Sequence, residues 1–383
     1  MAIINYITTI QFDFGALGTL PGECARLGIE RPLVITDAGV RRAGLLGKLE
    51  ATLGAAVAAK VYDGTESNPN ERAVSEAVAV FHEGRCDGLI ALGGGSSIDL
   101  AKGVALIATH GGSLQQYAAI EGGAARIGPS VAPVLAIPTT AGTGSEVGRG
   151  AVLILDDGRK VGILSPYLVP RAAVCDPELT FGLPPFLTAA TGMDAIAHCI
   201  ETFLSPVFNP PADGIALDGL ERAWRSIRVA VAQPRDAMAR RDMMSASMQG
   251  ALAFQKGLGC VHSLSHALGG IDPRLHHGTL NAIFLPAVIR FNADSPSVRD
   301  DRRMERLARA MGIEIACDAG EALAHEVARM SRELGLPRGL GQLDVDPSSY
   351  DLIAELAEAD HCHKTNPRLA TKRDYVAMLK EST

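Results

Sequence analysis

The chain has 383 residues, of which 47% are hydrophobic, and its formal net charge is −7. This length exceeds one typical core and predicts two domains, while the scattered Lys and Arg residues argue against nucleic acid as a partner. No apolar stretch reaches the ~18 residues of a membrane helix, no signal peptide is expected, and seven scattered cysteines without a CxxC motif indicate reduced thiols in the cytoplasm.

The first part of the chain alternates short β-rich runs with helical patterns. Strands are expected at residues 32–36, 58–62, 87–92 and 134–138. Helices are expected at residues 40–53 and 71–83, and from the glycine loop at 93–97 to residue 108. Alternation of strand and helix predicts a parallel sheet with helices on both faces.

After residues 176–177 the strand signals almost vanish and helical periodicity continues to the end. Helices are expected at residues 188–203, 216–231, 303–311, 319–334 and 350–359. We place the boundary near Leu183-Pro184-Pro185, which gives an α/β domain at 1–182 and an all-helical domain at 183–383. Crevices where such domains meet commonly hold ligands.

Two loops follow predicted strands and suit phosphate or ribose binding. The first is Gly93-Gly94-Gly95-Ser96-Ser97-Ile98-Asp99, which opens a helix. Glycines admit a close phosphate, and a helix N-terminus offers free N–H groups. The loop matches neither the P-loop pattern nor the GxGxxG fingerprint, and a plain tight turn remains an alternative. The second loop, Pro138-Thr139-Thr140-Ala141-Gly142-Thr143-Gly144-Ser145-Glu146, adds hydroxyl donors, and the pair suits a dinucleotide better than a single phosphate.

Asp37 ends the first predicted strand. Its carboxylate can accept hydrogen bonds from an adenosine ribose and would repel a 2′-phosphate, which favours NAD over NADP. The alternative is that Asp37 only caps the helix that follows.

The strongest chemical signal lies in the helical half. Asp194 and His198 are four residues apart, as are His262 and His266, so each pair lies on one helix face. His276 and His277 follow shortly afterwards. An Asp with two or three His side chains is a ligand set for Fe²⁺ or Zn²⁺.

Several segments in fixed order resemble the iron-containing (group III) alcohol dehydrogenases, namely residues 93–99, 138–146, 188–198 and 262–278. The resemblance covers essentially the whole chain. It implies an N-terminal α/β domain that binds NAD, an all-helical C-terminal domain that binds the metal and carries catalysis, and a site in the cleft. This architecture is shared with the dehydroquinate synthases.

The resemblance also implies roles for individual residues. The expected metal ligands, for Fe²⁺ or alternatively Zn²⁺, are Asp194, His198, His262 and His277. His266 matches a histidine implicated in proton transfer. The expected cofactor contacts are Asp37, Asn68, Gly94, Gly95, Ser96, Asp99, Thr139, Thr140, Thr143 and Lys160. The interval before the His-Gly pair is one residue longer than in many members, so His276 competes with His277 as the fourth ligand.

Subgroup features resemble the 4-hydroxybutyrate dehydrogenase branch of the family. They lie at residues 117–123, 244–250, 253–260 and 360–367. Interconversion of 4-hydroxybutyrate and succinic semialdehyde requires a cation for the substrate carboxylate, and the candidates are Lys256 with His361 and His363. Lys256 could instead be a helix-end cation that satisfies carbonyl groups.

Three alternatives stay open at this point. The same chemistry could act on lactaldehyde, a diol or maleylacetate. A dehydroquinate synthase-like lyase would also use NAD and a metal, and a metal- and nucleotide-binding sensor would need both sites without catalysis. The expected partners are a small aldehyde or alcohol and further copies of the chain, as a homodimer or higher homo-oligomer, with neither nucleic acid nor membrane.

Overall fold

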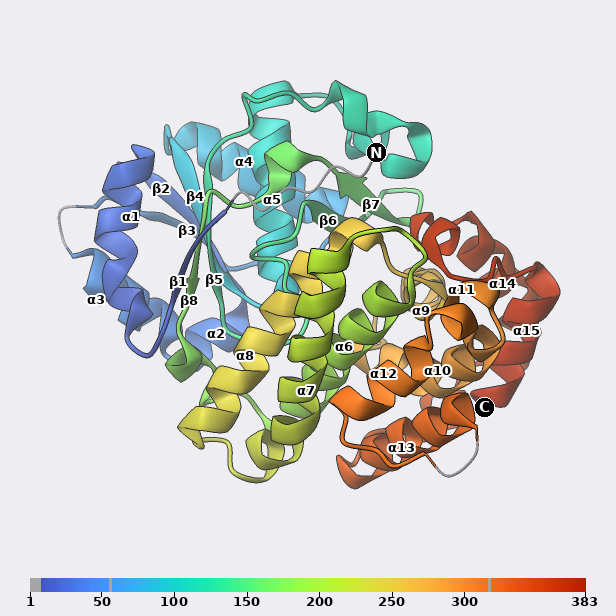
Figure 1. Ribbon diagram of the computed structural model, residues 1–383. Coiled ribbons are helices and arrows are strands. Elements are labelled where there is room, and N and C mark those ends of the chain that lie inside the picture. The colour runs from blue at the N-terminus through green and yellow to red at the C-terminus, as the bar shows by residue number, and fades with distance from the viewer. Residues whose placement is uncertain (1–7, 55–56, 316–317) are drawn as a thin grey trace. The chain divides into compact units, whose positions relative to one another are not determined.

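The computed structural model describes residues 8–54, 57–315 and 318–383, which form two compact units (Figure 1). An α/β unit comprises residues 8–140 and 145–183, and a helical unit comprises residues 141–144 and 184–383. Among the described residues, none of the helices combines the length and apolar character that a membrane span requires.

The α/β unit is built on a six-stranded parallel sheet in the order β1-β8-β5-β4-β2-β3. Its strands are β1 (Thr9–Phe12), β2 (Pro32–Ile35), β3 (Lys60–Tyr62), β4 (Gly88–Gly93), β5 (Val134–Pro138) and β8 (Ala172–Cys175). The four predicted strands are confirmed as β2 to β5, whereas the sequence analysis missed β1 and β8.

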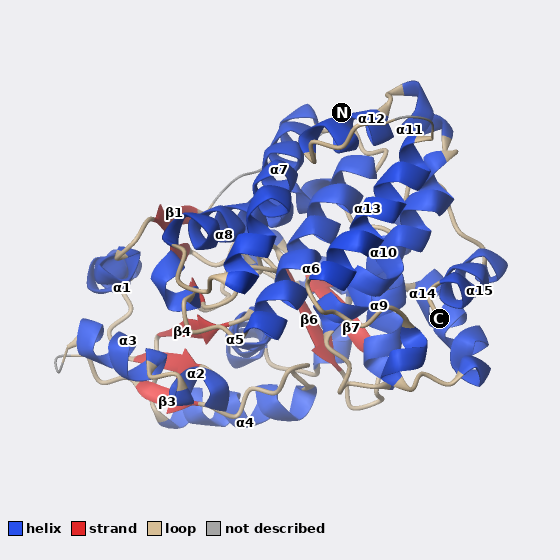
Figure 2. Cartoon of the chain, turned by 90° about the horizontal axis from the view of Figure 1, so that it is seen from below, coloured by secondary structure: helices blue, strands red, loops and turns tan. Residues whose placement is uncertain are grey.

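Alternate residues of the central strands β2, β4 and β5 face two separate apolar clusters, so helices cover both faces of the sheet. Leu33 and Ile35 pack with residues of α4 (Glu71–Glu83) and α5 (Gly95–His110). Val34 packs on the opposite face with residues of α1 (Leu20–Leu27) and α3 (Leu45–Leu53). Figure 2 shows the strands of this unit among their helices. Burial on both faces explains why the central strands read as continuous apolar runs.

One predicted helix of the α/β unit is wrong in its extent. The expected helix at 40–53 is two helices, α2 (Ala38–Arg42) and α3, because Gly44 between them adopts a left-handed conformation with φ 78°. An antiparallel hairpin of β6 (Gly150–Ile154) and β7 (Lys160–Leu164) was also missed. Leu153 and Val161 from this hairpin join the apolar cluster beside α5.

The helical unit contains no strand among its described residues, which confirms the predicted all-helical second part. Its helices are α6 (Pro185–Leu204), α7 (Pro210–Ala232), α8 (Ala237–Leu252), α9 (Cys260–Ile271), α10 (His277–Ala293), α11 (Pro296–Asp300), α12 (Arg303–Ala310), α13 (Ala319–Glu333), α14 (Tyr350–Ala359) and α15 (Lys372–Glu381). Every predicted helix of this part matches one of them. The helix α10 packs against both α6 and α9, which brings three segments distant in the sequence together.

Candidate active site

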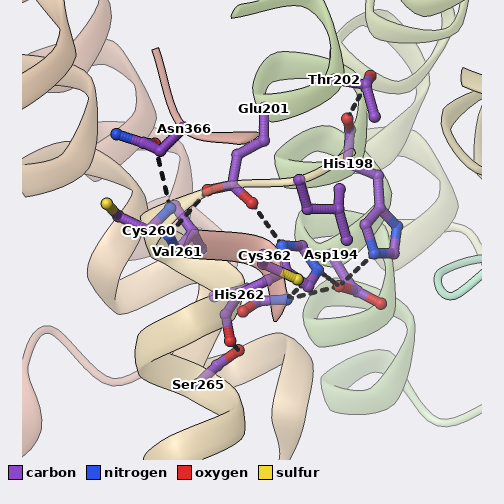
Figure 3. A network of polar contacts seen from close by, with 12 residues as sticks. Asp194, His198, Glu201, Thr202, Cys260, Val261, His262, Ser265, Cys362 and Asn366 are labelled. Carbon is purple, nitrogen blue, oxygen red and sulfur yellow. Dashed lines mark hydrogen bonds and ion pairs between the residues drawn. The ribbon is translucent and has the colours of Figure 1, made fainter. Parts of the chain in front are cut away.

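The four expected metal ligands converge inside the helical unit, and Figure 3 shows three of them, Asp194, His198 and His262. Asp194 and His198 lie one turn apart on α6, His262 lies on α9, and His277 begins α10. Asp194 Oδ1 lies 3.5 Å from Nε2 of His198, 3.6 Å from Nε2 of His262 and 3.7 Å from Nε2 of His277. One carboxylate oxygen therefore faces three imidazole nitrogens.

These separations fit a shared divalent cation. Metal–ligand bonds of about 2.1 Å in a tetrahedral site place the ligand atoms roughly 3.4 Å from one another. The Asn281 amide nitrogen occupies the space that these atoms face. It donates to Asp194 Oδ1 at 2.7 Å and lies 3.2 Å from His262 Nε2 and 3.1 Å from His277 Nε2. Three acceptor atoms thus point to one small volume, which is the arrangement that a cation requires.

The electrostatics of this cluster also favour a cation. Burial disfavours the charged form of Asp194, but the surrounding histidines outweigh burial and hold its pKa below the usual range. Burial likewise opposes protonation of His262, yet the carboxylates of Asp194 and Glu201 outweigh it and raise the pKa of His262 to about 9, so positive charge is stabilised at this ring and a metal ion displaces the proton when it binds. Burial lowers the pKa of His198 to about 4, so this imidazole is neutral and able to bind a metal at neutral pH.

Outer contacts orient two of these imidazoles. His262 Nδ1 lies 2.5 Å from Glu201 Oε2, and Glu201 Oε1 also accepts a hydrogen bond from the Val261 backbone N–H at 2.7 Å. His198 Nδ1 lies 3.2 Å from the carbonyl oxygen of Gly142. Both contacts use Nδ1 and direct Nε2 to the cluster, a common arrangement at metal sites. The sequence analysis missed Glu201, although it lies two helical turns after Asp194 on α6.

The structure distinguishes the two candidates for the fourth ligand. The ring of His276 packs edge-on against Phe186 with centroids 6.3 Å apart, whereas His277 directs Nε2 to Asp194. His266 lies close by and stacks on His277 at 5.5 Å, with its Nδ1 3.1 Å from Asp360 Oδ2.

The three residues predicted to bind a substrate carboxylate lie in different surroundings. The ammonium group of Lys256 is buried, contacts Asp213 Oδ1 and donates to the Phe203 carbonyl at 3.1 Å. Its charge is therefore already neutralised within the protein, as the helix-end alternative anticipates. His361 is half-buried and stacks on His266 at 5.6 Å. His363 instead directs Nδ1 to the Tyr375 hydroxyl at 3.0 Å.

In the α/β unit, three of the predicted cofactor residues, Asp37, Gly94 and Thr140, follow the carboxyl ends of β2, β4 and β5. A Cβ at Gly93 would lie 3.4 Å from Asp37 Oδ2, and a Cβ at Gly94 would lie 3.3 Å from the Thr140 side chain. The chain leaves β2 towards one edge of the sheet and leaves β4 towards the other. Such a switch point is where open α/β sheets bind ligands.

The expected contacts at this end of the sheet are held by hydrogen bonds. Asp37 caps α2 by accepting from Gly39 and Val40, and both bonds end on Oδ1. The Ser96 hydroxyl donates to the Ser67 carbonyl at 2.5 Å, and Lys160 Nζ donates to Asn68 Oδ1 at 2.8 Å. Gly95 begins α5, whose N-terminal N–H groups are available for a phosphate.

Asp99 connects α5 to neighbouring segments of the α/β unit through hydrogen bonds. Its Oδ1 accepts from the Ser145 hydroxyl at 2.5 Å and its Oδ2 accepts from the Val152 N–H at 3.0 Å, so it ties α5 to the threonine-rich loop and to β6. The buried ammonium of Lys102 also donates to Ser145, at 2.7 Å. Thr139 is buried at the end of β5, and Thr143 lies in the segment 141–144, which belongs to the helical unit.

Comparison with known proteins identifies relatives along the whole chain. The family model described as iron-containing alcohol dehydrogenase matches residues 8–177, and the C-terminal model of the same family matches residues 188–383. A protein of Cupriavidus necator described as 4-hydroxybutyrate dehydrogenase is 59% identical and is covered along 100% of both chains. The 1,3-propanediol dehydrogenase of Klebsiella pneumoniae is 34% identical over 97% of this chain and 96% of its own length. A solved structure of a 1,3-propanediol oxidoreductase superposes with a TM-score of 0.93 at 34% identity and full coverage of both chains.

Proposed function

Since this chain belongs to the iron-containing alcohol dehydrogenases and is an oxidoreductase that acts on CH–OH groups, we propose that its substrate pair is 4-hydroxybutyrate and succinic semialdehyde. The relative from Cupriavidus necator, 59% identical over the full length, supports this substrate. Other relatives are described as a 1,3-propanediol dehydrogenase and a lactaldehyde reductase, which favours oxidoreductase over lyase chemistry.

The observation that carries the proposal is the convergence of Asp194, His198, His262 and His277 on one volume inside the helical unit. We assign these side chains as the ligands of a divalent iron. When bound, the iron supplies Lewis-acid stabilisation of charge on the substrate oxygen, and NAD(H) supplies the hydride chemistry. Asp194, His198 and His262 are buried, which excludes bulk water from their side of the site and strengthens the charge interactions there.

We assign NAD to the α/β unit. Gly94, Gly95 and Ser96 would contact the pyrophosphate, because they form the N-terminus of α5 at the switch point of the sheet. Asp37 uses Oδ1 to cap α2, which leaves Oδ2 to accept from an adenosine ribose. Asn68 and Lys160, which bond to each other, are assigned to the nicotinamide end, together with Thr139, Thr140 and Thr143.

His266 is assigned as the residue that moves a proton to or from the substrate oxygen. Asp360 accepts from its Nδ1 and so directs the opposite ring nitrogen, Nε2, away from α14 and its following turn. We assign the contact with the substrate carboxylate to His361, because it is half-buried and stacks on His266. Lys256 is left out of this role, since Asp213 already neutralises it.

The cellular location and the oligomeric state complete the proposal. We assign the protein to the cytoplasm, because all six described cysteines are free thiols. We also propose a homodimer or higher homo-oligomer, because Phe208 and Val207 expose 76% and 40% of their surface. Light scattering coupled to size exclusion measures the oligomer directly.

The test is metal removal followed by restoration. Chelation should abolish NADH-dependent reduction of succinic semialdehyde, and Fe²⁺ should restore it better than Zn²⁺ or Mn²⁺. Propanal, lactaldehyde and maleylacetate serve as competing substrates in the same assay. Equal kcat/KM for propanal and succinic semialdehyde would reject the carboxylate substrate while leaving the family activity intact.

A further inference from the structure

A second group of metal-ligand side chains lies in the helical unit, and it comprises His266, Asp360, His361 and Cys362. Each offers one ligand atom, and these atoms all lie within 4.8 Å of one another. We propose that this group, called the thiol cluster below, binds one thiol-seeking divalent cation such as Zn²⁺, and that its occupancy inhibits the enzyme.

The local backbone prepares the thiol cluster. Asp360 caps the short helix His361–Thr365, and its Oδ1 accepts a hydrogen bond from the Cys362 N–H at 2.8 Å. That bond fixes the carboxylate so that Oδ2 faces Nδ1 of His266 at 3.1 Å and Nδ1 of His361 at 3.5 Å. The Cys362 sulfur lies 3.5 Å from Nε2 of His361. Four donors from two segments therefore surround one small volume.

The donor set has the chemistry of a zinc site rather than of a magnesium or calcium site. Thiolate and imidazole select zinc-like cations, and four-coordinate zinc commonly combines Cys, His and Asp. Asp360 and the Cys362 thiolate together balance the charge of a dication. On binding, the Cys362 thiol proton leaves to solvent as the metal–sulfur bond forms. Burial and the Asp360 charge raise the pKa of that thiol well above its usual value, so the cation is what drives its loss.

The thiol cluster is separate from the iron ligands, none of which is a cysteine, yet the two are adjacent. The ring of His266 stacks with that of His277 at 5.5 Å and with that of His361 at 5.6 Å. A cation held by His266 and Asp360 would consume the imidazole assigned to proton transfer. Inhibition therefore rests on the proposed function, whereas binding of the second cation does not.

The binding test uses Co²⁺ as the probe on the iron-loaded enzyme. We expect one further equivalent of Co²⁺ to bind with a thiolate-to-cobalt absorption band in the near ultraviolet, while the iron content stays constant. Cys362→Ser should lose the band and His361→Ala should weaken it. His363→Ala is the matched control, because His363 faces Tyr375 instead, and it should keep the band. A band that persists in Cys362→Ser, its absence from the wild type, or loss of iron in step with cobalt uptake would each overturn the proposal.

The inhibition test measures the Zn²⁺ concentration that halves each variant's own uninhibited rate. Cys362→Ser and His361→Ala should raise that concentration by about tenfold or more, because even an outer contact of a metal site is worth this much. His363→Ala should shift it less than about twofold. Cobalt binding without inhibition by Zn²⁺ would overturn the inhibitory role of the thiol cluster but not its binding of a cation. An iron-loaded wild type without dehydrogenase activity would reject only the proposed function.

Discussion

Replacing Glu201 by glutamine isolates the contribution of an outer contact to iron binding. The Glu201 carboxylate is buried and holds two donors, His262 Nδ1 at 2.5 Å and the Val261 N–H at 2.7 Å. A glutamine of the same shape has one oxygen for these two donors, and its NH₂ group must face the other one. It also removes one of the two negative charges that favour positive charge at His262. Both changes weaken the site without removing a ligand.

The expected loss follows from the behaviour of such contacts. Outer partners of metal-bound histidines are worth 10–100-fold in metal affinity, which corresponds to about 1.4–2.7 kcal/mol. We expect the upper half of this range, because a buried donor is left facing another donor. NAD affinity should not change, and saturating iron should restore much of the activity.

Competition with a chromophoric chelator under anaerobic conditions measures the affinity for Fe²⁺. Glu221→Gln is the matched control, because it removes the same charge from an exposed position on α7, where Glu221 faces Arg225 at 3.9 Å. Circular dichroism verifies that both variants fold. An iron affinity for Glu201→Gln within about twofold of Glu221→Gln would refute the assigned role of Glu201.

Three further outcomes test other parts of the molecule. Asp37→Ser keeps a cap for α2 but removes the charge, so the kcat/KM ratio for NADP over NAD should rise about tenfold; an unchanged ratio would contradict the ribose assignment. Burial raises the pKa of Glu146 to about 7, so its contribution to stability is present below its unfolded pKa near 4.5 and is lost as the pH rises through 7. The free energy of unfolding should therefore fall by up to about 3 kcal/mol between pH 5 and pH 8 through this group, and Glu146→Gln should flatten that slope in chemical denaturation. Lys256→Ala should lower stability by about 1–3 kcal/mol, because Asp213 loses its contact with Lys256 and keeps Arg303, at 3.4 Å, and it should not change KM for succinic semialdehyde. His361→Ala should instead raise that KM, and the reverse pattern would return the carboxylate role to Lys256.

Local patterns predict much of this fold because the elements that carry the site have strong local signals. The central strands β2, β4 and β5 are apolar throughout, and the ligand pairs on α6 and α9 show the spacing of one helical turn. The strands β1 and β8 were missed, since TIQF is a short run of mixed polar and apolar residues and AAVC contains a single β-branched residue.

Pairs of side chains that lie far apart in the sequence leave no local pattern from which the pairing could be predicted. Lys256 pairs with Asp213, 43 residues away, and His266 pairs with Asp360, 94 residues away. Spacing along one helix says nothing about which carboxylate another helix presents. Tertiary packing decided that Lys256 is neutralised internally and that His266 is oriented by Asp360, which follows α14, so these roles required the structure.

The glycine at position 278 allows α10 to pack closely against α6 beside the metal ligands. A Cβ at this position would lie 2.2 Å from the Ala190 carbonyl oxygen and 3.3 Å from the Asp194 side chain. Only glycine therefore allows the start of α10 to approach α6 closely enough for His277 to face Asp194. Gly278→Ala should push His277 away, lower iron affinity by about tenfold or more, and destabilise the unit by about 1–3 kcal/mol. Gly214→Ala, at a helical glycine where an added Cβ meets open space, is the control; it should leave iron affinity unchanged and raise stability by up to about 1 kcal/mol. Iron affinity in Gly278→Ala equal to that of Gly214→Ala would mean that the approach of α10 to α6 does not position the fourth ligand.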